Sequence, residues 1–156
     1  MCIRDSLMGS CNPVLDISRL QKSVDETFPV SCKIDLSGID KSFGVVEVDG
    51  EIKNSYGSLL VNMTFRGMYK TACDRCLEAV ALPLRAEIST SLTAEGSKDD
   101  SIAVEKGRID LQKKAYDALC LEIPMRILCR EDCKGLCYIC GQNLNIKQCD
   151  CVKDNI

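Results

Sequence analysis

The stretch Cys129-Arg-Glu-Asp-Cys133-Lys-Gly-Leu-Cys137-Tyr-Ile-Cys140-Gly, closed by Cys149-Asp-Cys151, holds six cysteines within 23 residues. A Cys-x2-Cys pair followed by glycine is typical of a zinc knuckle, because the glycine lets backbone N–H groups turn toward the sulfurs. Cys137–Cys140, here called the second knuckle, has this form, and Cys73–Cys76 upstream is the first knuckle. The chain has no histidine, so a metal site must use cysteines or recruit a carboxylate. The predicted metal ligands are Cys73, Cys76, Cys129, Cys133, Cys137, Cys140, Cys149 and Cys151.

The order of these cysteines predicts how they pair around structural Zn²⁺. The four from Cys137 to Cys151 are the nearest complete set in the sequence, and local pairs cost little loop entropy. Cys129 and Cys133 are then left to join the first knuckle in a second site, which ties the tail to the β-rich part of the chain. A single site from Cys133, the second knuckle and one tail cysteine is the alternative, so the sequence leaves open whether one or two zinc ions bind.

A secreted disulfide framework would also be rich in cysteine. The first twenty residues contain Arg4, Asp5 and Asp16 and no continuous apolar segment, so no signal peptide is visible. No apolar run approaches the roughly 18 residues that a membrane span needs. These features favour a reducing, cytoplasmic setting without a membrane partner, where such spacing indicates metal more often than disulfides.

The formal net charge of −3 limits the partners of the chain. Two filled four-thiolate zinc sites would take this charge to about −7, since each adds four thiolates and one divalent ion. That charge argues against DNA and against non-specific nucleic-acid binding, so an RNA contact would need a local basic patch. The candidate residues are Arg66, Lys70, Arg75, Arg126, Arg130, Lys134 and Lys147, with Glu131, Asp132 and Asp150 interspersed.

No motif in the chain indicates catalysis. The lack of histidine removes Ser–His and Cys–His activation of a nucleophile and the commonest general base. A phosphate-binding glycine loop is also missing from the sequence. A dithiol oxidoreductase built on Cys73 and Cys76 is disfavoured, because strand-like alternation resumes directly after this pair instead of a helix. We therefore expect a protein that is not an enzyme.

Alternating apolar and polar residues predict four strands of an antiparallel sheet with one buried face. Cys32 falls in the buried register and is predicted to be a small core residue. Asn54 to Gly57 predicts a hairpin turn, and Gly50 predicts a bulge. Pro83 lacks an N–H and predicts that its strand is an edge strand or is bulged there. The four segments are 30–36, 46–52, 59–69 and 80–92, and residues 14–24 fit either a strand or a short helix.

Asp110 can cap a helix that ends before Pro124, with an apolar face on Leu111, Ala115, Ala118 and Leu119. The predicted fold class is therefore α+β and mainly β: an antiparallel sheet, one principal helix at 110–123 and a C-terminal Cys-rich zinc knuckle. We expect residues 1–10 to be non-native or disordered and residues 11–128 to form the β-rich core domain. Residues 129–156 are expected to form a zinc-binding tail packed on that core.

Three pieces of the chain, in this order and spacing, resemble the YceD family, the large ribosomal RNA subunit accumulation proteins. They are Cys73-Asp-Arg-Cys76-Leu77 after a strand, Ile109-Asp110-Leu111 leading into Leu121-Glu-Ile-Pro124, and Cys129-x3-Cys133-Lys-Gly-Leu-Cys137-x2-Cys140-Gly-Gln-Asn143-Leu144-Asn145. Tyr138 stands where the resemblance leads us to expect proline in the knuckle turn.

The resemblance implies a bacterial, cytoplasmic, non-enzymatic protein that large-subunit ribosomal RNA needs in order to accumulate. It would act by binding precursor ribosomal RNA or an early pre-ribosomal particle, with zinc supporting the fold. The alternative function is a zinc-thiolate redox switch, which releases its metal on oxidation. The oligomeric state and the RNA segment or assembly protein that is contacted stay open.

Overall fold

The computed structural model describes residues 14–18, 20–22, 25–92, 104–105 and 107–151. These residues fall into two units. The first comprises the residues up to Met68 together with Pro83–Ile123, and the second comprises Tyr69–Leu82 together with the chain from Pro124 onward. Residues 1–10, predicted to be non-native or disordered, lie outside the described part. The predicted domain boundary between 128 and 129 stays a prediction.

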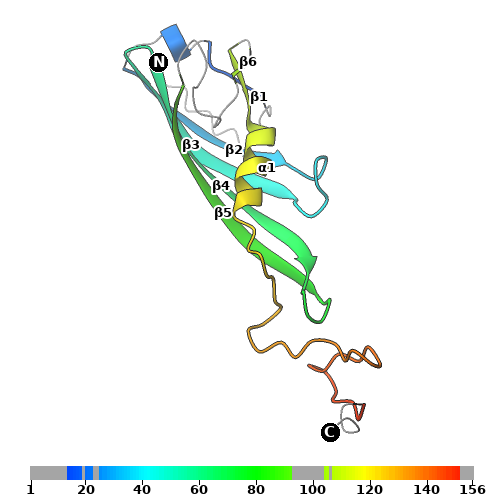
Figure 1. Ribbon diagram of the computed structural model, residues 1–156. Coiled ribbons are helices and arrows are strands. Elements are labelled where there is room, and N and C mark those ends of the chain that lie inside the picture. The colour runs from blue at the N-terminus through cyan, green and yellow to red at the C-terminus, as the bar shows by residue number, and fades with distance from the viewer. Residues whose placement is uncertain (1–13, 19, 23–24, 93–103, 106, 152–156) are drawn as a thin grey trace. The chain divides into compact units, whose positions relative to one another are not determined.

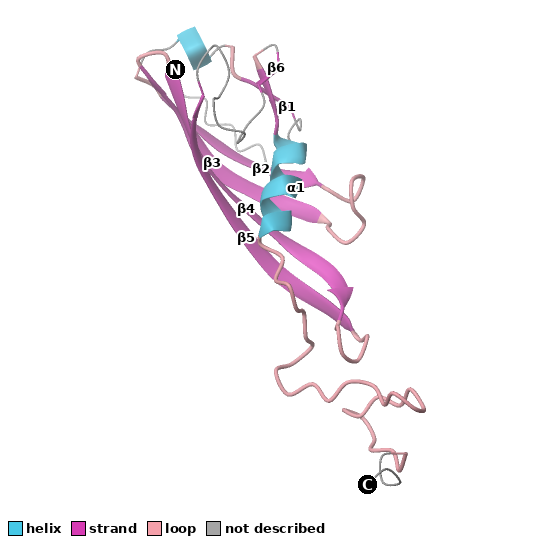
Figure 2. Ribbon diagram, in the orientation of Figure 1, coloured by secondary structure: helices cyan, strands magenta, loops and turns pink. Residues whose placement is uncertain are grey.

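The main sheet contains four strands in the spatial order β2-β3-β4-β5 (Figures 1 and 2). Antiparallel pairing joins β2 to β3 and β3 to β4, as the alternating pattern predicts. Val46, Val48 and Phe65 on the inner face are fully buried. Pro83 lies in β5, which is an edge strand as one of the two predictions had it, and edge strands are where proline is usually tolerated in a sheet. The strands are β2 (Thr27–Asp35), β3 (Val45–Ser55), β4 (Ser58–Ala72) and β5 (Ala79–Leu92).

Gly50 does not form the predicted bulge. The register runs without interruption from Val30 through Gly50 to Met63 on the third strand. A Cβ atom on Gly50 would overlap the carbonyl oxygen of Asn62 and lie 2.8 Å from the Cα of Met63. Glycine is needed here because two backbones approach closely, which is the second common reason for glycine inside a strand.

The predicted hairpin turn between β3 and β4 is confirmed. Tyr56 and Gly57 have φ values of 48° and 92°, as a two-residue primed turn requires. Asn54 at its start is only 1% exposed. Its Nδ2 donates to the Leu20 carbonyl oxygen at 2.8 Å, and its Oδ1 accepts from the Gly57 N–H at 3.3 Å. The buried amide is therefore satisfied on both sides, which fixes the turn.

The helix α1 (Leu111–Leu121) is the principal helix, slightly shorter than the predicted 110–123. Asp110 caps it as predicted, with its carboxylate accepting from the Lys113 N–H at 3.1 Å. The predicted apolar face is buried. The helix lies across one face of the main sheet (Figure 1). No helix in the described ranges is long and apolar enough to cross a membrane.

A smaller sheet, in the order β1-β7-β6, precedes α1. Its strands are only two or three residues long: β1 (Val14–Asp16), β6 (Val104–Glu105) and β7 (Arg108–Asp110). A single 3-10 turn, η1 (Leu20–Lys22), follows β1, so the ambiguous segment 14–24 contains both a strand and a short helix. Because β7 ends at the capping residue of α1, this sheet leads directly into the helix.

Cys32 differs from its predicted role as a buried core residue. Its side chain is half-buried, and the residue is disulfide-bonded. The other cysteines among the described residues are all free thiols, including the eight predicted metal ligands. The disulfide therefore leaves the predicted ligand set intact.

Candidate metal centres

The second unit brings all eight predicted ligands into two clusters. In each cluster the four sulfur atoms lie within 4.8 Å of one another. The first cluster joins the turn between β4 and β5 to the segment after Pro124, and the second lies entirely within that segment. The first consists of Cys73, Cys76, Cys129 and Cys133, and the second of Cys137, Cys140, Cys149 and Cys151. These are the two sets that the order of the cysteines suggested.

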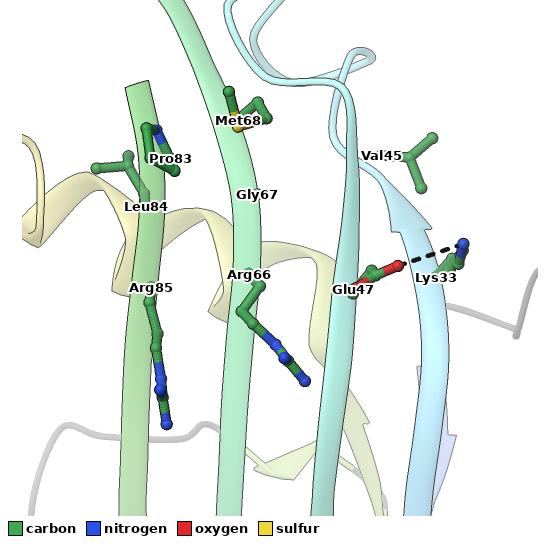
Figure 3. Close-up of a pocket in the computed structure, with 9 residues that line it drawn as sticks. All are labelled: Lys33, Val45, Glu47, Arg66, Gly67, Met68, Pro83, Leu84 and Arg85. Carbon is green, nitrogen blue, oxygen red and sulfur yellow. Dashed lines mark ion pairs between the residues drawn. The ribbon is translucent and has the colours of Figure 1, made fainter. Parts of the chain in front are cut away.

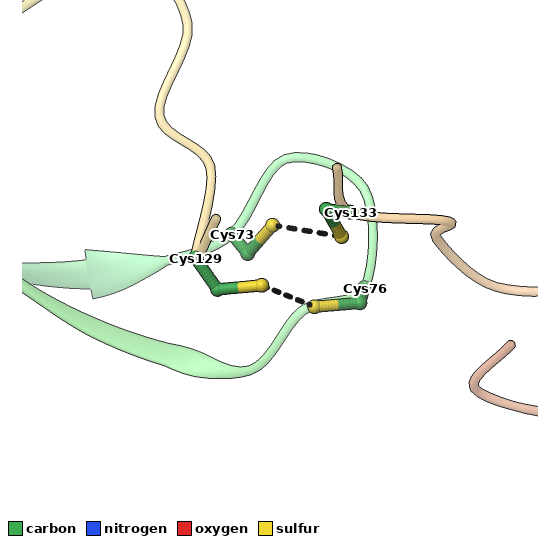
Figure 4. Close-up of side chains that lie close together, drawn as sticks. All are labelled: Cys73, Cys76, Cys129 and Cys133. Atoms are coloured by element: carbon green, nitrogen blue, oxygen red, sulfur yellow. Dashed lines mark hydrogen bonds between the residues drawn. The ribbon is translucent and has the colours of Figure 1, made fainter. Parts of the chain in front are cut away.

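The sulfur spacing in the first cluster fits four ligands around one ion. The Sγ atoms of Cys73 and Cys133 are 3.8 Å apart, and those of Cys76 and Cys129 are 3.5 Å apart (Figure 4). A disulfide bond would need about 2.05 Å. A tetrahedron with metal–sulfur bonds of about 2.3 Å has edges of about 3.8 Å. The cluster therefore has the dimensions of a tetrahedral thiolate site.

The two knuckles have the same backbone hydrogen bonds. The Cys73 N–H donates to the Glu78 carbonyl oxygen at 2.8 Å, and the Leu77 N–H donates to the Cys73 carbonyl oxygen at 3.0 Å. In the second knuckle the Cys137 N–H reaches the Gln142 carbonyl oxygen at 2.8 Å, and the Gly141 N–H reaches that of Cys137 at 2.9 Å. Both turns need a positive φ after the second cysteine, 61° at Leu77 and 73° at Gly141.

The first cysteine of each knuckle is held as a thiolate by backbone N–H groups. N–H donors of Cys140 and Ile139 lower the pKa of Cys137 to about 6. Burial opposes ionisation of Cys73, but N–H bonds from Cys76, Arg75 and Cys129 outweigh burial and lower its pKa to about 6. Each knuckle thus presents one ready-made anionic ligand.

Other sulfurs in each cluster resist ionisation. An N–H bond from Glu78 favours the Cys76 thiolate, but burial and the neighbouring sulfurs outweigh this bond and raise the Cys76 pKa to about 12. The sulfur of Cys140, together with burial, raises the pKa of Cys151 to about 12. Four thiolates this close repel one another unless a cation sits among them. Zn²⁺ fits this donor set, since it prefers soft thiolate ligands in a tetrahedron.

Hydrogen bonds tie the first knuckle to the segment that supplies its other two ligands. The Asp74 N–H donates to the Ile127 carbonyl oxygen at 2.8 Å, and the Ile127 N–H donates back to the Asp74 carboxylate at 2.6 Å. The Leu136 N–H donates to the Arg75 carbonyl oxygen at 3.1 Å, and the Arg75 guanidinium donates to the Cys133 carbonyl oxygen at 2.8 Å. Arg75, predicted as an RNA contact, therefore also supports the first cluster.

Asn143 and Asn145 contribute to the site in a way that sequence analysis did not identify. Asn145 Nδ2 donates to the Sγ of Cys133 at 3.3 Å, and this bond is the main reason that the pKa of Cys133 is lowered. Asn143 Nδ2 donates to the Glu78 carboxylate at 3.2 Å. The only sequence signal was their fixed spacing after the second knuckle, which suggested no particular role.

The other basic candidates are exposed but differ in their partners. Arg66 lies in the first unit and forms an ion pair with Asp49 at 2.5 Å. Arg130 lies in the second unit, 3.9 Å from the Asp132 carboxylate. Among the described residues, no ion pair engages the remaining candidates, all in the second unit: Lys70, Arg126, Lys134 and Lys147.

A shallow hollow of about 450 Å³ lies on the first unit where Arg66 and Arg85 run side by side (Figure 3). Each cation around it has a carboxylate partner. Lys33 pairs with Glu47 at 3.3 Å, Arg85 pairs with Glu87 at 2.5 Å, and Arg66 pairs with Asp49. The ion pairs make this hollow a weak candidate for binding phosphate.

Comparison with known proteins identifies the family that this chain matches. Residues 61–156 match the family described as large ribosomal RNA subunit accumulation protein YceD, and this range includes both cysteine clusters. An uncharacterized protein of Mycobacterium leprae is 28% identical over 133 residues, which cover 80% of this chain and 61% of that protein. An uncharacterized protein of Mycobacterium bovis is 28% identical over 146 residues, covering 81% of this chain and 68% of that protein. The chain thus spans about two thirds of the length of these relatives.

A plant relative matches a shorter region. The chloroplastic large ribosomal RNA subunit accumulation protein YCED homolog 1 of Arabidopsis thaliana is 42% identical over 50 residues, 32% of this chain and 16% of that protein. No solved structure matches. The family match covers more than half of the chain and all eight clustered cysteines, and the chain belongs to the YceD family.

Proposed function

We propose that this protein is a non-enzymatic, cytoplasmic ribosome-biogenesis factor that large-subunit ribosomal RNA needs in order to accumulate. The observation that carries the proposal is the family match over residues 61–156. Two plant relatives, from Arabidopsis thaliana and Zea mays, bear this role in their names.

Zn²⁺ in both clusters serves as a structural cofactor in this proposal. After the helix ends, the described chain to Cys151 contains no helix or strand, so few backbone ladder bonds stabilise it. A metal held by four thiolates replaces that missing regular structure. In small modules such binding supplies folding free energy of roughly 10 kcal/mol or more.

The partner is precursor ribosomal RNA or an early pre-ribosomal particle, and the second unit makes the contact. Lys134 and Lys147 are exposed on the cysteine-rich segment and are not engaged in ion pairs within the described residues. The overall negative charge of the chain means that recognition is local and does not come from bulk attraction to phosphate.

The experiment measures ribosomal RNA in cells that lack the gene and in cells complemented with variants. Loss of the gene should lower large-subunit ribosomal RNA relative to small-subunit ribosomal RNA, and the wild-type gene should restore the ratio. Lys134→Ala/Lys147→Ala should restore it only partly, while the exposed Lys41→Ala in the first unit serves as the control. An unchanged ratio in cells without the gene would sink the proposal.

A zinc-thiolate redox switch is the second candidate, favoured by the exposed position of Cys140. An exposed thiolate ligand is open to peroxide, and its oxidation to sulfenic acid or disulfide would release the metal. Mild peroxide would then release zinc and lower the ribosomal RNA ratio together. Release of zinc with no change in the ratio would exclude this function.

A further inference from the structure

We propose that the two cysteine clusters are coupled through Asn145, a positioning residue: metal in the second cluster holds the Asn143–Asn145 segment in place, and Asn145 then stabilises metal in the first cluster. This inference rests on the metal binding proposed above. It adds that metal in the second cluster raises the metal affinity of the first cluster.

The orientation of the Asn145 amide follows from its partners. The Lys134 backbone N–H can only donate, and it lies 2.9 Å from Oδ1 of Asn145, so the amide oxygen must face it. The NH2 group is then turned to the Sγ of Cys133 at 3.3 Å. A donor aimed at a ligand sulfur stabilises the thiolate form that binds metal.

Backbone bonds place this segment against the first cluster. The Leu144 N–H donates to the Gly135 carbonyl oxygen at 2.9 Å, and Leu136 forms a β-bridge with Asn143. The Asn145 N–H donates to Oδ1 of Asn143 at 3.0 Å. The segment therefore has its own weak sheet-like contact with the residues that follow Cys133.

The second cluster brackets the same segment in the sequence. Cys140 precedes Asn143 by three residues, and Cys149 follows Asn145 by four. A metal that joins Cys140 to Cys149 closes this short loop and removes most of its conformational freedom. Without that metal, hydrogen bonds alone hold Asn145 near Cys133, including the bond from Asn143 to the Glu78 carboxylate. The first cluster then loses its donor for part of the time.

Such outer contacts are known to change metal affinity by about 10- to 100-fold. Coupling between two binding sites is reciprocal, so emptying either cluster should weaken the other by the same factor. The proposal therefore predicts that emptying the second cluster lowers the metal affinity of the first by the same factor as emptying the first lowers that of the second.

The test uses the full chain loaded with zinc and titrated with a chelator. Exposed thiols are alkylated at each chelator concentration, and peptide masses report which cluster has lost its metal. The variants are Asn145→Ala, Asn145→Asp, the double variant Cys149→Ser/Cys151→Ser and the triple variant Asn145→Ala/Cys149→Ser/Cys151→Ser. Gln148→Ala, an exposed residue of the same segment, is the matched control.

Asn145→Ala should lower the zinc affinity of the first cluster about ten-fold or more. Asn145→Asp should also lower it, because aspartate still accepts from Lys134 but offers no donor to Cys133 and adds a negative charge. Cys149→Ser/Cys151→Ser should lower the same affinity by a similar factor, with no further loss when Asn145→Ala is added. Gln148→Ala should leave it unchanged.

An unchanged first-cluster affinity in Cys149→Ser/Cys151→Ser would overturn the coupling, and so would a loss that adds fully to that of Asn145→Ala. Wild-type protein without zinc would also overturn it. The absence of zinc would also remove the metal from the proposed function, whereas the other two results would overturn the coupling alone. The ribosomal RNA ratio is measured independently of all three, so failure of the coupling and failure of the proposed role in ribosomal RNA accumulation can be told apart.

Discussion

The two cysteine clusters share one knuckle geometry but differ in their surroundings. The first is packed with Val80, Leu128 and Leu136, and three of its four cysteines are buried. In the second only Cys137 is buried, and Cys140 is exposed. The first cluster also joins residues that are 53 and 60 positions apart, whereas the second closes a short local loop. The same knuckle geometry thus cross-links distant segments in the first cluster and closes a short loop in the second.

The largest expected effect comes from removing ligands of either cluster. Wild-type protein purified without chelator should contain two zinc ions by elemental analysis, and Cys73→Ser/Cys76→Ser and Cys137→Ser/Cys140→Ser should each contain one. The loss of stability should be larger for the first pair, since its metal also cross-links distant segments and can contribute roughly 10 kcal/mol. One zinc in the wild type, unaffected by the change at Cys73 and Cys76, would contradict the two-site pairing.

Metal loss should occur in a fixed order. Because Cys140 is exposed and three of the four cysteines of the first cluster are buried, chelator or mild peroxide should empty the second cluster first. Alkylation followed by peptide mass analysis would follow the two sets of thiols separately. If the thiols of the first cluster react at the same rate, burial does not protect it and the contrast between the clusters is wrong.

Asp74→Ala should destabilise the first cluster. The carboxylate accepts a 2.6 Å bond from the Ile127 N–H, and bonds to charged groups contribute about 1.5–3 kcal/mol. Thermal unfolding of the zinc-loaded protein would measure this loss. Asp132→Ala is the control, because the ion pair that it forms within the described part of the chain, with Arg130, is long and exposed. Equal effects of the two changes would mean that the Asp74 bond adds nothing specific.

The smallest effect compares the residue after each knuckle. Gly141→Ala places a side chain at φ 73° and should destabilise the second knuckle by about 1 kcal/mol. Leu77→Gly relieves the same conformation at φ 61° in the first knuckle and should not destabilise it, as Leu77 is 67% exposed. Thermal unfolding of both variants tests this asymmetry. A clear loss of stability in Leu77→Gly would show that contacts of the leucine side chain stabilise the first knuckle, and the predicted asymmetry would be wrong.

The sequence predicted features that depend on local chemistry. Strand alternation, the Asp110 cap and the Tyr56–Gly57 turn follow from short-range rules, and the structure confirms them. The role of Gly50 was predicted wrongly, because the approach of the Asn62 carbonyl depends on the neighbouring strand. Strands of two or three residues, as in the small sheet, are too short to show a period.

The cysteine groups could be anticipated because local pairs favour local closure. The supporting residues could not, since Arg75 reaches Cys133 from 58 residues away, and Asn145 reaches it from 12 residues away only after the chain between them has folded back. A polar side chain beside a metal ligand looks like any other surface residue in the sequence. Arg75 was accordingly predicted only as an RNA contact.

The long separation within the first cluster has a consequence during protein synthesis. Cys73 and Cys76 leave the ribosome well before Cys129 and Cys133, and the closest of these partners are 53 residues apart. At a synthesis rate of about 5–20 residues per second, roughly 3–10 s pass between the synthesis of the first two cysteines and that of their partners. During that interval Cys73 and Cys76 lack their partner ligands. Whether they stay as free thiols depends on the reducing power and the metal supply around the ribosome.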